Sequence, residues 1–237
     1  MKVIITGATG VVGGGALQVA LKHPEVTSVV VLVRRETGVS DPKLKTIIKK
    51  DYTRYEPEDW EHLRGADGCI WCVLPTQYSY AATDVLIRYR ALGSPTDGME
   101  VHQRYPRVAL EAFSTHLAAH TSSGKPFRFV LTSGAAVISN QSIWLPPGLS
   151  MLQERGKMEL EFLEFAAKNQ GRWQSFVARP AMVLKPGASS WLPAMAKIPV
   201  EVLGAAMVDA IANGWEEQTK GNGALKARGE AAVKLMK

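Results

Sequence analysis

The chain has 237 residues, of which 46% are hydrophobic and 21% are charged, close to the averages for globular proteins. This composition excludes a disordered or collagen-like chain, and the length suits one α/β domain that needs no disulfide or metal to stabilise its core. The formal net charge is +6, but the basic residues are scattered rather than gathered in blocks, so we expect no nucleic-acid or membrane partner.

The sequence starts with a short apolar run that leads directly into a glycine-rich turn. This start leaves no room for the charged region, apolar region and cleavage site of a signal peptide. No apolar run is long enough for a transmembrane helix. We therefore expect a cytoplasmic protein.

Short apolar runs alternate with segments of helical pattern, which indicates strand–helix–strand units and a parallel sheet. The runs are nearly continuous and rich in Val and Ile, as is typical of strands covered by helices on both faces. The predicted strands are residues 3–6, 28–33, 45–48, 68–74, 127–131 and 175–178. The predicted helices are residues 11–22, 99–119, 152–168 and 200–212.

Three irregular stretches follow predicted strands, at residues 75–98, 145–148 and 185–197. Ligands bind beyond the carboxyl ends of the strands in open α/β sheets, so we expect these stretches to close over one crevice. Large apolar side chains in or next to these stretches suit a fairly apolar substrate, the core or a partner surface. These side chains are Trp144, Leu145, Trp191, Leu192, Met195 and Ile198.

Neither the cysteines nor the histidines predict a metal site. Cys69 and Cys72 form a C-x-x-C pair, but they lie in a predicted strand, where residues three apart point to opposite faces. His116 and His120 have a spacing that fits a metal on a helix, but the sequence offers no third ligand. We expect neither metal binding nor cysteine redox chemistry.

The most informative motif is a glycine turn between the first predicted strand and the first predicted helix. Gly7 permits the tight turn, Gly10 lets the backbone approach a pyrophosphate, and Gly13 lets the helix pack closely on the sheet. The helix N-terminus offers free N–H groups and a partial positive charge to phosphates. The turn therefore predicts a dinucleotide site. Its predicted contacts are Gly7, Thr9, Gly10, Val11, Val12 and Gly13.

The end of the second predicted strand indicates which dinucleotide binds. An acidic residue there would bond the ribose 2′-hydroxyl of NAD, whereas this chain has Arg34 and Arg35. A guanidinium binds a 2′-phosphate through two parallel hydrogen bonds. Glu36 follows and leaves NAD open as the alternative. We predict NADP(H) as the cofactor, with Arg34 and Arg35 among its ligands.

The glycine spacing, the basic strand end and the strand pattern resemble the short-chain dehydrogenase/reductase superfamily. Within it, the chain resembles the atypical, NmrA-like or TIP30-like branch of NAD(P)-binding proteins. The resemblance covers residues 2–183 and implies a Rossmann-type, doubly wound parallel sheet with a small C-terminal substrate-covering region. We predict one such domain over residues 1–237, in which residues 184–237 contribute the substrate-side region.

The resemblance implies further cofactor contacts. Asp51 is similar to the acid that contacts the adenine in this superfamily. The strand end that flanks the ribose and nicotinamide is matched here by Val73, Leu74 and Pro75. The segment beside the nicotinamide is matched by Pro180, Ala181 and Val183.

The resemblance departs from the family at the catalytic helix. The family's reductases use Tyr-x-x-x-Lys, in which the tyrosine exchanges the proton while the lysine holds the nicotinamide ribose and lowers the tyrosine pKa. Lys157 fits the lysine position, but Gln153 stands at the tyrosine position. Glutamine cannot exchange a proton near neutral pH, although it can orient a carbonyl by hydrogen bonding. Ser133 matches the family's active-site serine at the end of the fifth strand.

Three functions remain open at this point. The favoured one is an oxidoreductase acting on a small, fairly apolar carbonyl or imine substrate. Its candidate proton donors are Tyr78, Tyr80, Tyr105, His102 and a water held by Ser133. The alternatives are a non-redox isomerase, cyclase or rearrangement enzyme, and a cofactor-sensing regulatory protein. The predicted catalytic residues are Ser133, Lys157, Gln153 and Tyr78.

Overall fold

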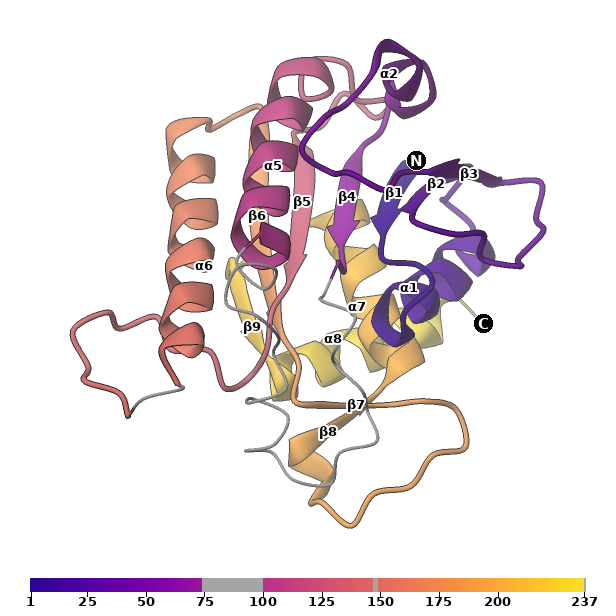
Figure 1. Ribbon diagram of the computed structural model, residues 1–237. Coiled ribbons are helices and arrows are strands. Elements are labelled where there is room, and N and C mark those ends of the chain that lie inside the picture. The colour runs from indigo at the N-terminus through magenta and orange to yellow at the C-terminus, as the bar shows by residue number, and fades with distance from the viewer. Residues whose placement is uncertain (74–99, 147–148, 237) are drawn as a thin grey trace.

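The computed structural model describes residues 1–73, 100–146 and 149–236. In this part of the chain, a seven-stranded sheet has the order β3-β2-β1-β4-β5-β6-β9, with every adjacent pair parallel (Figure 1). Its strands are β1 (Lys2–Thr6), β2 (Ser28–Val33), β3 (Leu44–Ile48), β4 (Gly68–Trp71), β5 (Phe127–Thr132), β6 (Trp173–Arg179) and β9 (Thr219–Gly221). This arrangement confirms the predicted Rossmann-type α/β fold.

Helices cover both faces of the sheet, which explains the continuous apolar strands. One face packs against α1 (Val11–Lys22), α7 (Val200–Asn213) and α8 (Asn222–Leu235). The other packs against α2 (Pro57–Leu63), α5 (Tyr105–His116) and α6 (Ser150–Lys168). The two faces bury separate clusters, the first mainly aliphatic and the second rich in aromatic rings.

The glycines of α1 and α7 allow these two helices to approach each other closely. A Cβ added to Gly15 would overlap the side chain of Val200, and one added to Gly204 would lie 2.9 Å from the carbonyl oxygen of Gly15. Helix α7 therefore packs with α1 in the layer that covers one face of the sheet, and it does not lie over the carboxyl ends of the strands. The contribution of residues 184–237 to a substrate-side region stays a prediction.

Two predicted elements differ from the structure near the carboxyl ends of the strands. Strand β4 ends at Trp71, and the next N–H, that of Cys72, donates at 3.0 Å to the side-chain hydroxyl of Thr6 on the neighbouring strand β1 instead of to a backbone carbonyl. The helix predicted over residues 99–119 is a π-helical turn, η1 (Glu100–Arg104), followed by α5. Pro106 stands in the first turn of α5, where its missing N–H is tolerated.

Several short elements were not predicted. A small sheet pairs β7 (Met182–Leu184) with β8 (Lys197–Pro199), and a 3-10 turn, η2 (Ala194–Ala196), precedes β8. Helix α2 was missed although Pro57 and a reciprocal Glu56–Asp59 capping box mark its start. Strand β9 and helix α8 also lie outside the predicted elements.

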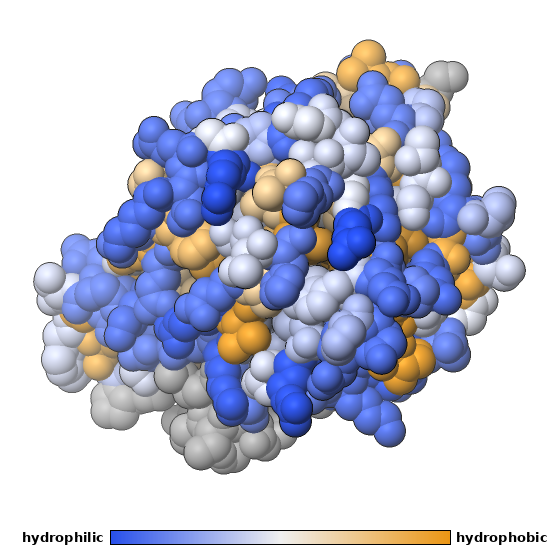
Figure 2. All heavy atoms as spheres, turned by 90° about the horizontal axis from the view of Figure 1, so that it is seen from above, coloured by the Kyte–Doolittle hydropathy of each residue, from blue (hydrophilic) through white to orange (hydrophobic). Residues whose placement is uncertain are grey.

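The two ends of the sheet differ in what they carry. The glycine turn and the β7–β8 sheet lie at the carboxyl ends of the strands, at the bottom of Figure 1. The opposite end, seen in Figure 2, is largely hydrophilic, with small and separate hydrophobic spots. Within the described ranges, no helix combines the length and apolar character needed to cross a bilayer.

Candidate functional site

The glycine turn is built at the junction of β1 and α1. Gly7 has φ of +65°, and a Cβ there would overlap the carbonyl oxygen of Cys72 on the neighbouring segment. A Cβ on Gly13 would overlap the Gly7 carbonyl group. Both positions therefore require glycine for the turn itself to close.

Gly10 differs from the other two glycines of the turn. Its backbone is extended, at φ −91° and ψ 175°, and it forms the N-cap of α1. A Cβ there would meet only the Gly7 oxygen, at 3.2 Å, so that oxygen would have to shift by a few tenths of an ångström. The fold itself therefore demands a glycine less strongly at this position than at Gly7 and Gly13, whereas a ligand close to the first N–H groups of α1 would leave no room for a side chain.

A groove of about 830 Å³ opens beside this turn. Thr9, Gly10 and Val11 form one end of it, and Lys22 lies further along α1. Its other walls come from the β7–β8 connection and from the first turn of α7 and the last turn of α8. The groove gives solvent and ligands access to the turn from the side of α1.

The predicted adenosine end lies where β2 and β3 finish. Arg34 and Arg35 are exposed directly after β2, and neither side chain has a hydrogen bond or ion pair to another described residue. Asp51 is exposed after β3, and it accepts hydrogen bonds from the backbone and hydroxyl of Thr53 at 2.8 and 2.7 Å. These bonds hold the pKa of Asp51 below its usual value. Positive and negative groups are therefore both available to a nucleotide at this edge.

The predicted substrate end contains a small hollow between β4, β5, η1, α5 and α6. Its enclosed volume is about 20 Å³, which holds only the end of a ligand. Ser133 lines it, and Val73 lines it from the segment after β4. The other lining residues are Trp71, Val101, His102, Pro106, Leu131, Thr132, Arg155 and Met158.

Ser133 is held in place by the backbone around it. Its N–H donates to the Ala178 carbonyl at 2.8 Å, which extends the β5–β6 pairing beyond the strand. The hydroxyl of the preceding residue, Thr132, lies 3.2 Å from the thiol sulfur of Cys72. Burial raises the pKa of the Cys72 thiol to about 12, so this cysteine stays a neutral packing group. Cys69 packs on the opposite face of the sheet, as its spacing predicts.

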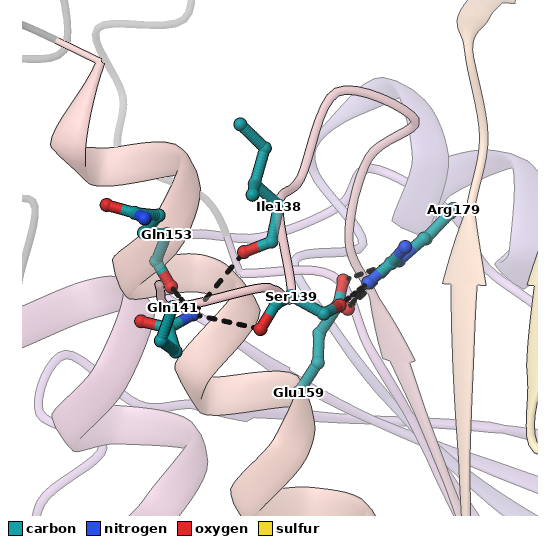
Figure 3. A network of polar contacts seen from close by, with 6 residues as sticks. All are labelled: Ile138, Ser139, Gln141, Gln153, Glu159 and Arg179. Atoms are coloured by element: carbon teal, nitrogen blue, oxygen red, sulfur yellow. Dashed lines mark hydrogen bonds and ion pairs between the residues drawn. The ribbon is translucent and has the colours of Figure 1, made fainter. Parts of the chain in front are cut away.

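The structure does not bring Gln153 to this hollow. The Gln153 carboxamide donates to the carbonyl of Ile143 at 2.6 Å and to that of Asn140 at 3.3 Å. Its backbone carbonyl accepts a hydrogen bond from Gln141 at 3.1 Å (Figure 3). Gln153 thus fastens the loop after β5 to the start of α6. Its catalytic role stays a prediction from the family resemblance.

Lys157 lies outside the hollow as well. Its side chain is exposed and has no ion pair or hydrogen bond with the described residues. Arg155 stands between Gln153 and Lys157, and residues two apart on a helix point in nearly opposite directions. The side of α6 that faces the hollow therefore presents Arg155 and Met158. The sequence argument did not single out Arg155.

A buried ionic network ties α6 to the end of β6. The carboxylate of Glu159, 2% exposed, accepts hydrogen bonds from the Arg179 guanidinium, which also donates to the Ser139 hydroxyl (Figure 3). Next along the chain, the Pro180 carbonyl accepts from the Ala135 N–H at 3.0 Å. The network fixes the start of the 180–183 segment that the resemblance places beside the nicotinamide.

That segment has a second anchor, which sequence reasoning missed. The Ala181 N–H donates to the side-chain oxygen of Asn222 at 2.8 Å. The Asn222 amide in turn donates to the Met195 carbonyl, also at 2.8 Å. Asn222 starts α8, so the C-terminal helix supports the predicted nicotinamide end. Val183 lies in β7, the strand that follows.

The structure places the predicted proton donors in different environments. His102 lines the hollow, and burial, assisted by the nearby Arg155 charge, lowers its pKa to about 3. It is therefore uncharged at neutral pH. Tyr105 packs against Tyr52 instead, with ring centroids 5.5 Å apart, and burial raises its pKa. The predicted residues Leu74, Pro75, Tyr78 and Tyr80 lie outside the described residues.

The remaining predictions concern metal ligands and apolar loops. His116 stacks on Trp60 with ring centroids 4.2 Å apart, and the described part of the chain has no cluster of potential metal ligands. Ile198 is a core residue rather than a loop side chain. By contrast, Trp144, Trp191 and Met195 are 79, 93 and 81% exposed.

Sequence comparisons match only part of the chain. No protein-family model matches the sequence. A 97-residue stretch is 30% identical to leucinostatins biosynthesis cluster protein T of Purpureocillium lilacinum. That stretch covers 37% of this chain and 36% of the relative, so the chain matches about a third of that protein's length.

Solved structures match over nearly the whole chain. The oxidoreductase ylbE from Lactococcus lactis is 17% identical with a TM-score of 0.57, covering 99% of this chain and 97% of that one. Gre2 from Candida albicans, in complex with NADPH, is 14% identical with a TM-score of 0.64, covering 92% and 77%. At these identities the likeness establishes the fold. The solved structures thus confirm the Rossmann-type architecture that the resemblance implied.

Proposed function

We propose that this chain binds NADP(H) at its glycine turn and reduces a small, fairly apolar carbonyl or imine substrate. The observation that carries the proposal is the turn itself. Gly7 and Gly13 are required by the surrounding backbone, whereas Gly10 leaves the first N–H groups of α1 open to a phosphate. The Rossmann-type neighbours with NADPH support this placement of a nicotinamide cofactor.

The preference for NADP(H) rests on the end of β2. Two exposed guanidinium groups, Arg34 and Arg35, follow that strand without a carboxylate partner among the described residues. A 2′-phosphate would supply the missing anion and accept paired hydrogen bonds. Asp51, whose ionised form is stabilised by hydrogen bonds from Thr53, would contact the adenine of the same nucleotide.

The substrate end would lie above the hollow that Ser133 lines. A bound reduced nicotinamide supplies a hydride, and the chain's own residues would position the acceptor. The Ser133 hydroxyl would hydrogen-bond the carbonyl oxygen or imine nitrogen, with neutral His102 beside it. Apolar walls from Trp71, Val101 and Met158 would exclude water from the reacting atoms.

Replacing Arg34 by alanine tests the cofactor preference. Because its guanidinium would bond only the 2′-phosphate, we expect NADPH to bind at least about tenfold more weakly while NADH affinity changes little. Isothermal titration calorimetry with both cofactors measures the two constants.

Arg172→Ala is the matched control, because Arg172 is an equally exposed arginine just before β6, at the opposite end of the sheet. It changes the net charge by the same amount and should leave both affinities unchanged. Equal losses for NADPH and NADH in Arg34→Ala would contradict the assigned role.

One observation favours a second candidate function. The described lining of the hollow contains no tyrosine, and Gln153 is engaged by the loop after β5. A protein that binds the cofactor without net redox chemistry, as a sensor or a rearrangement enzyme, would need no such donor. Loss of NADPH absorbance with any carbonyl or imine substrate would decide for the reductase.

A further inference from the structure

We propose that Arg155 binds a carboxylate carried by the substrate, so that the substrates of this site are small apolar acids. This inference rests on the proposed function, because it gives the substrate end of that site its binding cation. An arginine that has no acidic partner among the described residues lies at a hollow whose other described lining is apolar or neutral, and this juxtaposition carries the inference.

The guanidinium of Arg155 reaches the carboxyl end of β5. A Cβ built on Gly134 would lie 3.8 and 3.9 Å from its two terminal nitrogens, so both nitrogens point towards the residue after Ser133. Two neighbouring N–H donors in one plane match the two oxygens of a carboxylate. The small enclosed volume beside them accepts an end group of this size.

Arg155 has no acidic partner among the described residues. The lining residues that the structure describes include no Asp or Glu. The nearest carboxylates of α6 are already occupied: Glu154 accepts from Gln103 at 2.8 Å, and Glu159 pairs with Arg179. Within the described residues, the guanidinium of Arg155 therefore stays available to a ligand.

The rest of the hollow accounts for the apolar part of the substrate class. Trp71, Val101, Leu131 and Met158 contribute hydrocarbon surface. His102 adds no competing charge, because it is neutral at physiological pH. A partly desolvated cation in such surroundings binds an anion more strongly than an exposed lysine does. The expected ligand therefore combines a carboxylate with a short apolar chain.

The test compares a carboxylate with a neutral compound of the same shape. The probes are 4-methylpentanoate and 4-methylpentanamide, titrated by ligand-observed NMR with and without saturating NADP⁺. We expect the wild-type protein to bind the carboxylate at least about tenfold more tightly than the amide, as a charge-assisted hydrogen bond would give. Arg155→Met should remove this preference, and Arg155→Lys should retain part of it.

Two further variants isolate the position of the charge. Lys157→Met tests the competing lysine of the same helix, and Arg172→Met removes an arginine beyond the amino end of β6. Both should keep the carboxylate preference. Circular dichroism and thermal melting of every variant establish that the proteins compared are folded.

Equal binding of the two probes to wild-type protein would overturn the inference, as would an Arg155→Met protein that keeps the preference. Loss of the preference in Lys157→Met but not in Arg155→Met would also overturn it. The proposed function fails separately, through absence of NADP(H) binding. A carboxylate preference without cofactor binding would leave Arg155 as an anion site and reject the reductase.

Discussion

Alanine at Gly10 will leave the protein folded but weaken cofactor binding about 100-fold, whereas alanine at Gly13 will destabilise the fold itself. At Gly13 the new Cβ meets the backbone of Gly7 and Ala8, which cannot rotate away as a side chain can. Overpacking of this kind costs about 2–3 kcal/mol, or roughly 5–10 °C in Tm for a chain of this size.

At Gly10 the Cβ meets only the Gly7 oxygen at 3.2 Å, and alanine adopts the extended N-cap backbone without strain. The stability cost should stay below about 1 kcal/mol. The same methyl group would occupy the approach to the first N–H groups of α1. Losing phosphate hydrogen bonds there weakens the binding of NADPH by about 2.7 kcal/mol, which corresponds to the expected 100-fold loss of affinity.

Thermal melting and calorimetric titration of the two variants separate these effects. Gly223→Ala is the control, because a Cβ at this helical glycine of α8 meets nothing within 4 Å. It should change neither cofactor affinity nor, except for a slight gain, stability. If the Gly10→Ala protein bound NADPH as tightly as the wild type, the pyrophosphate would not bind at this turn.

Replacing Arg179 by methionine will destabilise the protein by about 3–5 kcal/mol, because it leaves the buried carboxylate of Glu159 without its cation. Glu159→Gln should cost less, since the Arg179 side chain is 23% exposed and water can solvate it. The double variant Arg179→Met/Glu159→Met should recover part of the loss, because it removes both buried charges. Urea unfolding of the three variants measures these differences.

The chain offers a matched ion pair for comparison. Arg107 and Glu161 join α5 to the same helix α6 at 2.6 Å, but their side chains are 42 and 33% exposed. Arg107→Met should therefore cost no more than about 1 kcal/mol. If Arg107→Met and Arg179→Met were equally destabilising, burial of Glu159 would not be the reason for the larger effect.

Local patterns were sufficient to predict the first βαβ unit. The predicted helix at residues 11–22 and strand at residues 28–33 coincide with α1 and β2, because the glycine turn and the Val-rich run act over short distances. The late elements escaped prediction for the opposite reason. Strand β9 has three residues and exists through pairing with β6, which local sequence does not encode.

The face that α6 turns to the site also depends on distant contacts. A Cβ at Gly156 would overlap the Ile138 carbonyl, and Glu159 must reach Arg179 on β6. These contacts set the rotation of the helix, so that Arg155 faces the hollow and the side chain of Gln153 bonds the loop after β5. A motif spacing identifies Lys157 but carries no information about this rotation.

We propose that a nicotinamide dinucleotide with a 2′-phosphate binds at the glycine turn, and calorimetric titration of the wild-type protein with NADPH and NADH measures this binding. We expect one saturable site per chain, with NADPH binding at least about tenfold more tightly than NADH. Absence of heat with both cofactors, at concentrations that saturate a micromolar site, would contradict it.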